Sequence, residues 1–240
     1  MRERYQRQMV IEQIGEKGQQ KLADSSVAII GTGGLGSPIL TYLTLAGVGN
    51  LSIIDYDKVE QSNLNRQFLH GTKDINTPKV LSAKEKLNAI NDEVKIHTHE
   101  TKLTKENAHD LLKGHDLVIG ALDSLETRFI VNETCINLNV PYIDGGVKEF
   151  GGYVIFTHPP KTPCFQCIFP QKKGKKESPG ILGVTAGTIG TLEADIALLH
   201  LLGLPNPLEN KLLIYDGLRL SIDLVAIKKD EKCNVCSRET

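Results

Sequence analysis

A glycine-rich turn, Gly31-Thr32-Gly33-Gly34-Leu35-Gly36, constrains the fold of this chain more than any other feature. The apolar run at 27–30 before it is typical of a buried strand, and residues 37–46 after it are typical of a helix closed by Gly47. Glycines permit the tight turn, and the helix N-terminus adds free N–H groups and partial positive charge. The order of strand, turn and helix predicts a phosphate-binding βαβ unit.

A carboxylate follows the next strand. The apolar run at 51–55 ends in Asp55, about twenty residues after the glycines, where an acidic side chain accepts hydrogen bonds from ribose hydroxyls. The pattern indicates a nucleotide without saying which one. The alternative is a tight turn that serves only the packing of the helix on the strand.

Short apolar runs continue to alternate with helical stretches. Further strands are expected over 94–99, 117–122, 141–144, 151–157, 212–215 and 222–227, and further helices over 77–91, 104–113, 128–138 and 187–202. The last strands are close enough in sequence to form hairpins. We therefore expect an α/β fold, a Rossmann-like, doubly wound and mostly parallel sheet extended by antiparallel C-terminal strands.

Length and charge narrow the class of protein. The chain has 240 residues, which fits a single domain over 1–240 with a nucleotide-binding half at 1–150. Its 28 basic and 29 acidic residues balance, which argues against a nucleic-acid partner. No apolar run approaches the roughly 18–20 residues that span a bilayer, and the polar first twenty residues lack a signal-peptide core. A cytoplasmic protein without a membrane partner is expected.

Charged residues near the predicted strand ends indicate a polyphosphate. Asp55 and Asp123 both follow strands, so we expect them to face the same crevice. Lys79 lies near a helix start, where a cation opposes the helix dipole at a cost of about 0.3–1 kcal/mol. With Arg66 and a divalent ion on Asp123, it would form a triphosphate clamp, which hydride transfer does not need. Alternatively, Lys79 extends into solvent and Arg66 joins a surface ion pair.

These motifs belong to a recognisable set. The chain resembles the ThiF/MoeB-type adenylyltransferases of ubiquitin-fold sulfur-carrier proteins, which are related to ubiquitin-activating enzymes. The matching segments run in order through nearly the whole chain: Arg4-Tyr5-Gln6-Arg7-Gln8, residues 31–36, 46–51 and 55–57, Ser62-Asn63-Leu64-Asn65-Arg66-Gln67, Pro78-Lys79, residues 116–118 with Asp123, Pro163-Cys164-Phe165-Gln166-Cys167, residues 187–190, and Cys233-Asn234-Val235-Cys236.

The resemblance implies a reaction and its residues. ATP would adenylate the C-terminal Gly-Gly carboxylate of a carrier, giving acyl-AMP and pyrophosphate, in thiamine or molybdenum-cofactor biosynthesis. The implied catalytic residues are Arg7, Arg66, Lys79 and Asp123, and the implied nucleotide contacts are Gly34, Asp55, Ser62, Asn63, Arg66, Lys79, Asp123 and Ser124. Asp123 would also bind magnesium, while Ser124 departs from the asparagine expected there. Arg7 would reach the phosphates of a neighbouring subunit, which implies a homodimer.

Four of the five cysteines form two C-x-x-C pairs, Cys164 with Cys167 and Cys233 with Cys236. Two such pairs form a Cys₄ zinc site when folding brings them together. Closed ligation leaves no open position, so the zinc would be structural, as the resemblance also implies. Redox cysteines or a metal-free site are the alternatives. Cys135 has apolar neighbours, which predicts a place in the core.

The second half, 151–240, would then hold the zinc and bind the carrier. Many relatives carry another cysteine before the segment that matches 180–183, but this chain has none between Cys167 and Cys233, and Ser178 cannot form a persulfide. We hypothesise that it adenylates its carrier and leaves sulfur delivery to another protein. The alternatives are activation of a peptide or tRNA carboxylate, or a non-catalytic nucleotide-binding scaffold.

Overall fold

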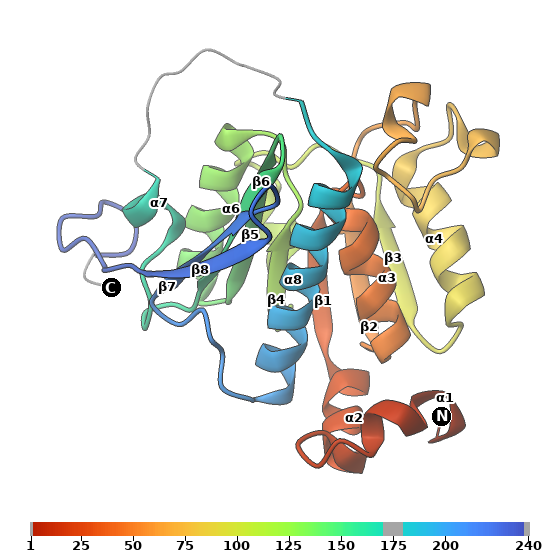
Figure 1. Ribbon diagram of the computed structural model, residues 1–240, viewed down its shortest axis with the longest axis horizontal. Coiled ribbons are helices and arrows are strands. Elements are labelled where there is room, and N and C mark those ends of the chain that lie inside the picture. Colours follow the sequence, from red (N-terminus) through yellow and green to blue (C-terminus); the bar gives the residue numbers. More distant parts are fainter. Residues whose placement is uncertain (1, 170–179, 238–240) are drawn as a thin grey trace.

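Eight strands form one sheet in the order β3-β2-β1-β4-β5-β6-β7-β8 (Figure 1). The computed structural model describes residues 2–169 and 180–237. Five strands are parallel: β1 (Ser26–Ile30), β2 (Asn50–Ile54), β3 (Lys95–His99), β4 (Leu117–Gly120) and β5 (Tyr142–Lys148). Antiparallel pairing adds β6 (Gly151–Thr157), β7 (Lys211–Asp216) and β8 (Ser221–Ala226). The predicted fold class is confirmed.

Helices cover both faces of the sheet (Figure 1). One face packs against α3 (Gly36–Ala46), α4 (Lys79–Ile90) and α8 (Gly183–Leu202), and the other against α5 (Ala108–Leu112) and α6 (Leu125–Leu138). The remaining helices are α1 (Arg2–Met9), α2 (Gly15–Asp24) and the short α7 (Phe165–Ile168), with 3₁₀ turns η1 (Gln61–Asn63) and η2 (Thr72–Asp74). Strand order changes direction between β1 and β4, where sheets of this kind bind ligands.

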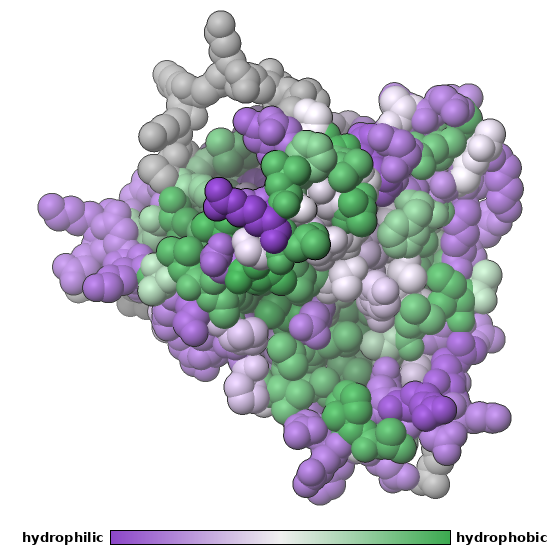
Figure 2. Space-filling view, viewed as in Figure 1, coloured by the Kyte–Doolittle hydropathy of each residue, from purple (hydrophilic) through white to green (hydrophobic). Residues whose placement is uncertain are grey.

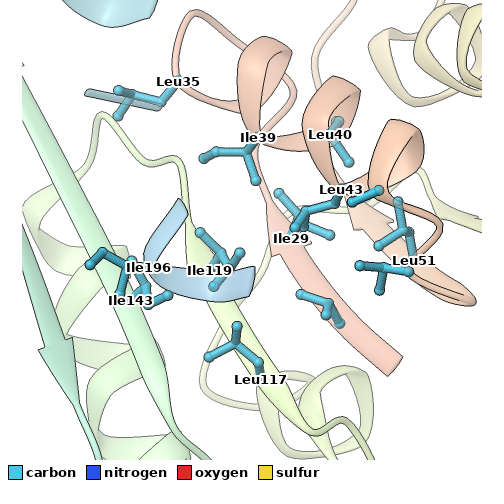
Figure 3. Packing of buried hydrophobic residues seen from close by; sticks show 14 of the residues in the cluster. Ile29, Leu35, Ile39, Leu40, Leu43, Leu51, Leu117, Ile119, Ile143 and Ile196 are labelled. Carbon is cyan, nitrogen blue, oxygen red and sulfur yellow. The ribbon is translucent and has the colours of Figure 1, made fainter. Parts of the chain in front are cut away.

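Strand β1 shows why the sheet is buried on both sides. Val27 and Ile29 join the core beneath α3 and α8, where Ile29 packs near Ile39 and Leu43 (Figure 3). Ala28 and Ile30 alternate with them and join the core beneath α5 and α6. A strand covered on both faces needs the unbroken apolar run that the sequence shows. Cys135 lies fully buried in this second core, as expected.

Two helices begin where the sequence pattern does not place them. α4 begins at Lys79, not at 77, because Val59 donates to the Thr77 carbonyl oxygen and Lys58 forms a β-bridge with Pro78. These contacts hold the Thr77–Pro78 segment extended. α8 begins at Gly183, four residues earlier than expected, since its first turn packs closely against the chain at Asn65.

The boundaries of α5 and α6 also differ from the expected ones. α6 starts at Leu125 because the Ser124 hydroxyl accepts a hydrogen bond from the Thr127 N–H (3.4 Å). α5 covers only Ala108–Leu112, because the Asn107 side chain accepts from the Thr104 N–H and forms a turn there. Over residues 2–169 and 180–237, no helix is both long and apolar enough to cross a membrane. The cytoplasmic location stays a prediction.

Candidate active site

The glycine-rich turn lies between the carboxyl ends of β1 and β4. Gly31 has φ +101°, and a Cβ atom on it would overlap the Ala121 carbonyl oxygen beyond β4. A Cβ on Gly36 would in turn overlap the Gly31 carbonyl oxygen. Both positions therefore require glycine for steric reasons. This close approach sets the N-terminus of α3 directly over the strand ends.

Asp55 ties the end of β2 to this turn. One oxygen, Oδ2, accepts from the Thr32 N–H (2.9 Å) and hydroxyl (2.8 Å), and Oδ1 accepts from the Asp57 N–H (2.9 Å). A carboxylate offers about four acceptor positions, so one remains on Oδ1. Asp55 can support the turn and still accept a ribose hydroxyl.

Lys79 lies one step further along the same edge of the sheet. Its Nζ atom is 3.0 Å from Asp57 Oδ2, and its side chain is 8% exposed against 47% for Asp57. The Lys79 N–H also donates to the Asp57 carbonyl oxygen (2.9 Å). Burial and a partly exposed counter-ion hold the ammonium group at the start of α4, where an anion could replace Asp57.

Arg66 lies against the glycine-rich turn from the opposite side. A Cβ atom on Gly34 would come within 3.5 Å of Arg66 Cγ and 3.2 Å of Ala186 Cβ, so these three residues are in close contact. The guanidinium donates to the carbonyl oxygen of Ser62 and to Asn65 Oδ1, both at 2.9 Å. Asn63 is buried in η1, where its Oδ1 accepts from the Glu60 N–H (3.1 Å). The predicted segment 62–67 thus forms one wall of the site.

The exposed side chain of Asp123 completes the group. The negative charge of Asp57, partial burial, and the charges of Asp123 and Asp55 all raise the pKa of Tyr56, so the three carboxylates act electrostatically on the same phenol. Oxygen ligands at a partly hydrated edge suit a magnesium ion. Ser124 follows directly as the N-cap of α6, which leaves its hydroxyl already engaged.

Arg7 does not join these residues within one chain. It lies exposed on α1, and its neighbours Arg4 and Tyr5 bond to Ile90 and Asn91 at the C-terminal end of α4. That end of the molecule is opposite the glycine-rich turn (Figure 1). A role for Arg7 at the nucleotide therefore requires a second chain.

A buried arginine beneath the site was not predicted. Arg128 of α6 donates to the Leu122 carbonyl oxygen, to Asp144, to the Gly145 carbonyl oxygen (2.8 Å) and to the Tyr153 hydroxyl (3.0 Å). It therefore joins the residue before Asp123 to β5 and β6. Helical periodicity gives no signal for it, because its partners lie on other elements.

Glu193 of α8 is another buried ionisable residue that the sequence did not single out. It is 0% exposed, and neither of its side-chain oxygens has a hydrogen-bond partner within the described residues. A Cβ atom on Gly145 would overlap its carboxyl group. Burial above all, and then the charge of Asp144, raises the pKa of Glu193 well above 4.5. Burial therefore favours the neutral form of this carboxyl group, against the opposing effects of Arg128 and Gly145.

The two cysteine pairs come together beyond β6. The Sγ distances are 3.8 Å for Cys164–Cys167, 3.7 Å for Cys164–Cys233 and 3.4 Å for Cys167–Cys236. Tetrahedral ligation at a Zn–S length of roughly 2.3 Å separates the sulfur atoms by about 3.8 Å. In the part of the chain that the structure describes, no other group of three or more ligand side chains is close enough together to hold a metal ion.

Comparison with known proteins identifies the family of this chain. The family model described as "ThiF family" matches residues 5–235. The chain belongs to the ThiF family. A sulfur carrier protein adenylyltransferase of Thermus thermophilus is 39% identical over 99% of this chain and 91% of its own length. A SAMP-activating enzyme E1 of Haloferax volcanii is 35% identical, over 98% and 88%.

Longer proteins also match this chain. An adenylyltransferase and sulfurtransferase MOCS3 of Culex quinquefasciatus is 36% identical, and the match covers 98% of this chain but 55% of that protein. The crystal structure of E. coli MccB with ATP is 23% identical with a TM-score of 0.88, covering 98% of this chain and 75% of that one, and this likeness concerns the fold alone. The prediction of a ThiF-family adenylyltransferase is confirmed at the level of enzyme class.

Proposed function

We propose that this ThiF-family chain catalyses the ATP-dependent adenylation of the C-terminal Gly-Gly carboxylate of a ubiquitin-fold sulfur-carrier protein. The observation that carries the proposal is the gathering of the Gly34 turn, Asp55, Arg66, Lys79 and Asp123 at one edge of the sheet. A cationic pair beside a glycine-rich turn and a carboxylate group suits a nucleoside triphosphate better than a dinucleotide.

In the proposed reaction, the carrier carboxylate attacks the α-phosphorus of ATP. A new O–P bond forms, the bond from the α-phosphorus to the bridging oxygen breaks, and pyrophosphate leaves with that oxygen. Negative charge increases on the phosphate oxygens in the transition state, where the fixed charges of Arg66 and Lys79 stabilise it. Lys79 would exchange its contact with Asp57 for a phosphate oxygen.

Magnesium would be held through Asp123, and Asp57 and Asp55 are further carboxylates whose charges act on the same residue, Tyr56. When bound, it would neutralise charge on the triphosphate. Asp55 would accept hydrogen bonds from the ribose. Ser62, Asn63 and Ser124 would lie beside the nucleotide and provide further contacts. The four cysteines would hold a structural zinc ion that fastens the C-terminal segment to the chain after β6.

The carrier would dock on the second half of the chain, 151–240. The β7–β8 hairpin exposes Leu218, Leu220, Ile222 and Leu224. Hydrophobic side chains gather over this hairpin and the adjoining part of α8 (Figure 2). An apolar patch of this kind is typical of a protein–protein contact. Docking there would place the carrier beside β5 and β6, the strands that Arg128 joins to Leu122, the residue before Asp123.

A second copy of the chain would supply Arg7. A mostly apolar groove of about 740 Å³ lies beside Arg66, between α3 and the first turns of α8, and includes the exposed Tyr42, Phe68 and Val184. A homodimer packed on this face would cover these side chains. It would also bring helix α1 of the second copy toward the site.

Exchange of labelled pyrophosphate into ATP tests the proposed function. Each Gly-Gly carrier of the same organism is added with magnesium, and at least one should support exchange. The same carrier lacking its last glycine is the matched control. Inertness of every carrier, with intact ATP binding, would contradict the substrate assignment, and exchange with a short peptide would favour peptide activation instead.

The products of the same reaction test how sulfur is delivered and which biosynthetic pathway the chain serves. Ser178 lies outside the described residues, and no cysteine stands between Cys167 and Cys233. We expect mass spectrometry after the reaction to show acyl-AMP but no thioester or acyl-disulfide with the chain. The carrier that supports exchange would identify the thiamine or the molybdenum-cofactor branch.

A further inference from the structure

A buried histidine, His70, contacts the backbone of the glycine-rich turn. His70 is 5% exposed, and its ring lies between two partners. Its Nε2 atom is 3.0 Å from the Thr32 carbonyl oxygen, and its Nδ1 atom is 2.9 Å from Ser82 Oγ. It belongs neither to the motif at 62–67 nor to the residues assigned to the nucleotide.

The chemistry of these partners fixes the proton positions. A carbonyl oxygen only accepts, so Nε2 must carry the hydrogen that is donated to Thr32. In the neutral ring Nδ1 then accepts from the Ser82 hydroxyl. Ser82 Oγ accepts in turn from Lys86 Nζ (2.9 Å), and this ammonium pairs with Asp74 (2.6 Å). Lys86 thus donates to both Asp74 and Ser82, and a directed chain of donors runs from Lys86 through Ser82 and His70 to the turn.

Thr32 is the residue through which this chain acts. It is fully buried, and its N–H and hydroxyl both donate to Asp55 while its carbonyl oxygen accepts from His70. All of its polar groups are therefore held, by Asp55 just after β2 on one side and by His70, in the loop between η1 and η2, on the other. Gly31, just before it, has the left-handed backbone that glycine adopts without strain, and its N–H donates to the Ile54 carbonyl oxygen (2.8 Å).

We propose that His70 is a positioning residue, whose neutral ring holds the Thr32 carbonyl so that the glycine-rich turn keeps the shape that receives the nucleotide phosphates. This inference rests on the proposed ATP site. Burial, assisted by the charges of Lys79 and Lys86 and opposed by Thr32 and Asp74, lowers the pKa of His70, which favours the neutral ring.

Two substitutions of matched polarity separate this role from general stability. In His70→Gln the side-chain amide nitrogen reaches the position of Nε2 and can still donate to Thr32, whereas in His70→Asn it reaches only the position of Nδ1. ATP affinity is measured directly by equilibrium dialysis, and KM and kcat by pyrophosphate exchange. We expect His70→Asn to weaken ATP binding and raise the KM for ATP by about tenfold, the effect of one buried hydrogen bond, with the KM for the carrier unchanged. His70→Gln should stay within about threefold of wild type on the same scale.

A half-buried histidine supplies the control. His115 bonds to Ser52 Oγ (2.9 Å) far from the turn, so His115→Asn should lower Tm without changing ATP affinity. If His70→Asn does not fold, Ser82→Ala tests the chain from its other side and should weaken ATP binding several-fold. Equal ATP affinities in wild type, His70→Asn and Ser82→Ala would overturn the inference. Dialysis needs no carrier, so failure of the exchange assay alone contradicts only the proposed function.

Discussion

At the scale of single residues, the candidate site consists of charged side chains that are buried or confined by their neighbours. Lys79 is nearly buried with Asp57 as its partner, and Arg66 is pressed between the turn and α8. Asp123 is exposed beside two further carboxylates. A polyanion with a divalent cation would satisfy all of these groups together.

Asp123→Asn should therefore abolish magnesium-dependent exchange, with kcat reduced by about 10²–10³, the range seen when one charge-stabilising group is removed. ATP binding without magnesium should be little changed. Asp110→Asn is the control, since Asp110 is an exposed residue of α5 that pairs with Lys113 and His109 at its surface. Full exchange activity in Asp123→Asn would exclude the proposed magnesium ligand.

Glu193 predicts a distinctive dependence of stability on pH. Its pKa is raised in the folded state, so the folded chain binds a proton that the unfolded chain releases above pH 4.5. Stability is therefore lost as pH rises from 4.5 towards the raised pKa, by about 1.4 kcal/mol for each unit.

Glu193→Gln removes this titration. Denaturant unfolding at several pH values should show that the variant gains stability relative to wild type as pH rises from 4.5 to 7. The difference should shrink again in acid. Parallel curves for the two proteins across this range would show that Glu193 titrates normally.

At the scale of elements, some helices and strands follow from local sequence, and others depend on long-range contacts. The unbroken apolar run of β1 is visible in the sequence, and the helix expected over 187–202 is present within α8, where Ile189 and Ile196 are buried and Leu192 and Leu199 are partly buried. The start of α4 was misplaced because the Lys58–Pro78 bridge joins segments that no helix signal relates. The N-terminal helices α1 and α2 were missed, since the segment is polar and packs by a few contacts such as Lys21 with the Leu202 carbonyl oxygen.

The cysteine cluster gives a prediction for the C-terminal segment. Cys233→Ser should lose the zinc ion, measured by metal analysis of the purified chain, and should lower Tm by roughly 2–4 °C for each kcal/mol of stability lost. Cys135→Ser is the control, because Cys135 is buried in the core on α6 and should affect Tm without releasing metal. Equal metal content in wild type and Cys233→Ser would exclude zinc ligation.

At the scale of the whole molecule, one chain holds an incomplete set of the predicted groups. Arg7 lies at the opposite end from the glycine-rich turn, while the groove beside Arg66 is lined by exposed apolar side chains. Both observations are explained if a second copy packs on this face.

Mixing two inactive variants tests this arrangement. Arg7→Ala and Asp123→Ala should each lack exchange activity, yet unfolding and refolding them together should restore about a quarter of wild-type activity. Half of the pairs in a two-fold dimer would be mixed, and each mixed pair holds one intact site. No recovery, or full activity of Arg7→Ala alone, would contradict a shared site.

The sequence by itself determined the fold class, the place of the glycine-rich turn and the two C-x-x-C pairs, because each depends on residue types at short, fixed spacings. Only the tertiary structure decided that Thr32 is held by His70 and Asp55, that Arg128 joins Leu122 to β5 and β6, and that Glu193 is buried beside Gly145. Those contacts join residues far apart in the chain. Their strength comes from exclusion of water, which no local pattern records.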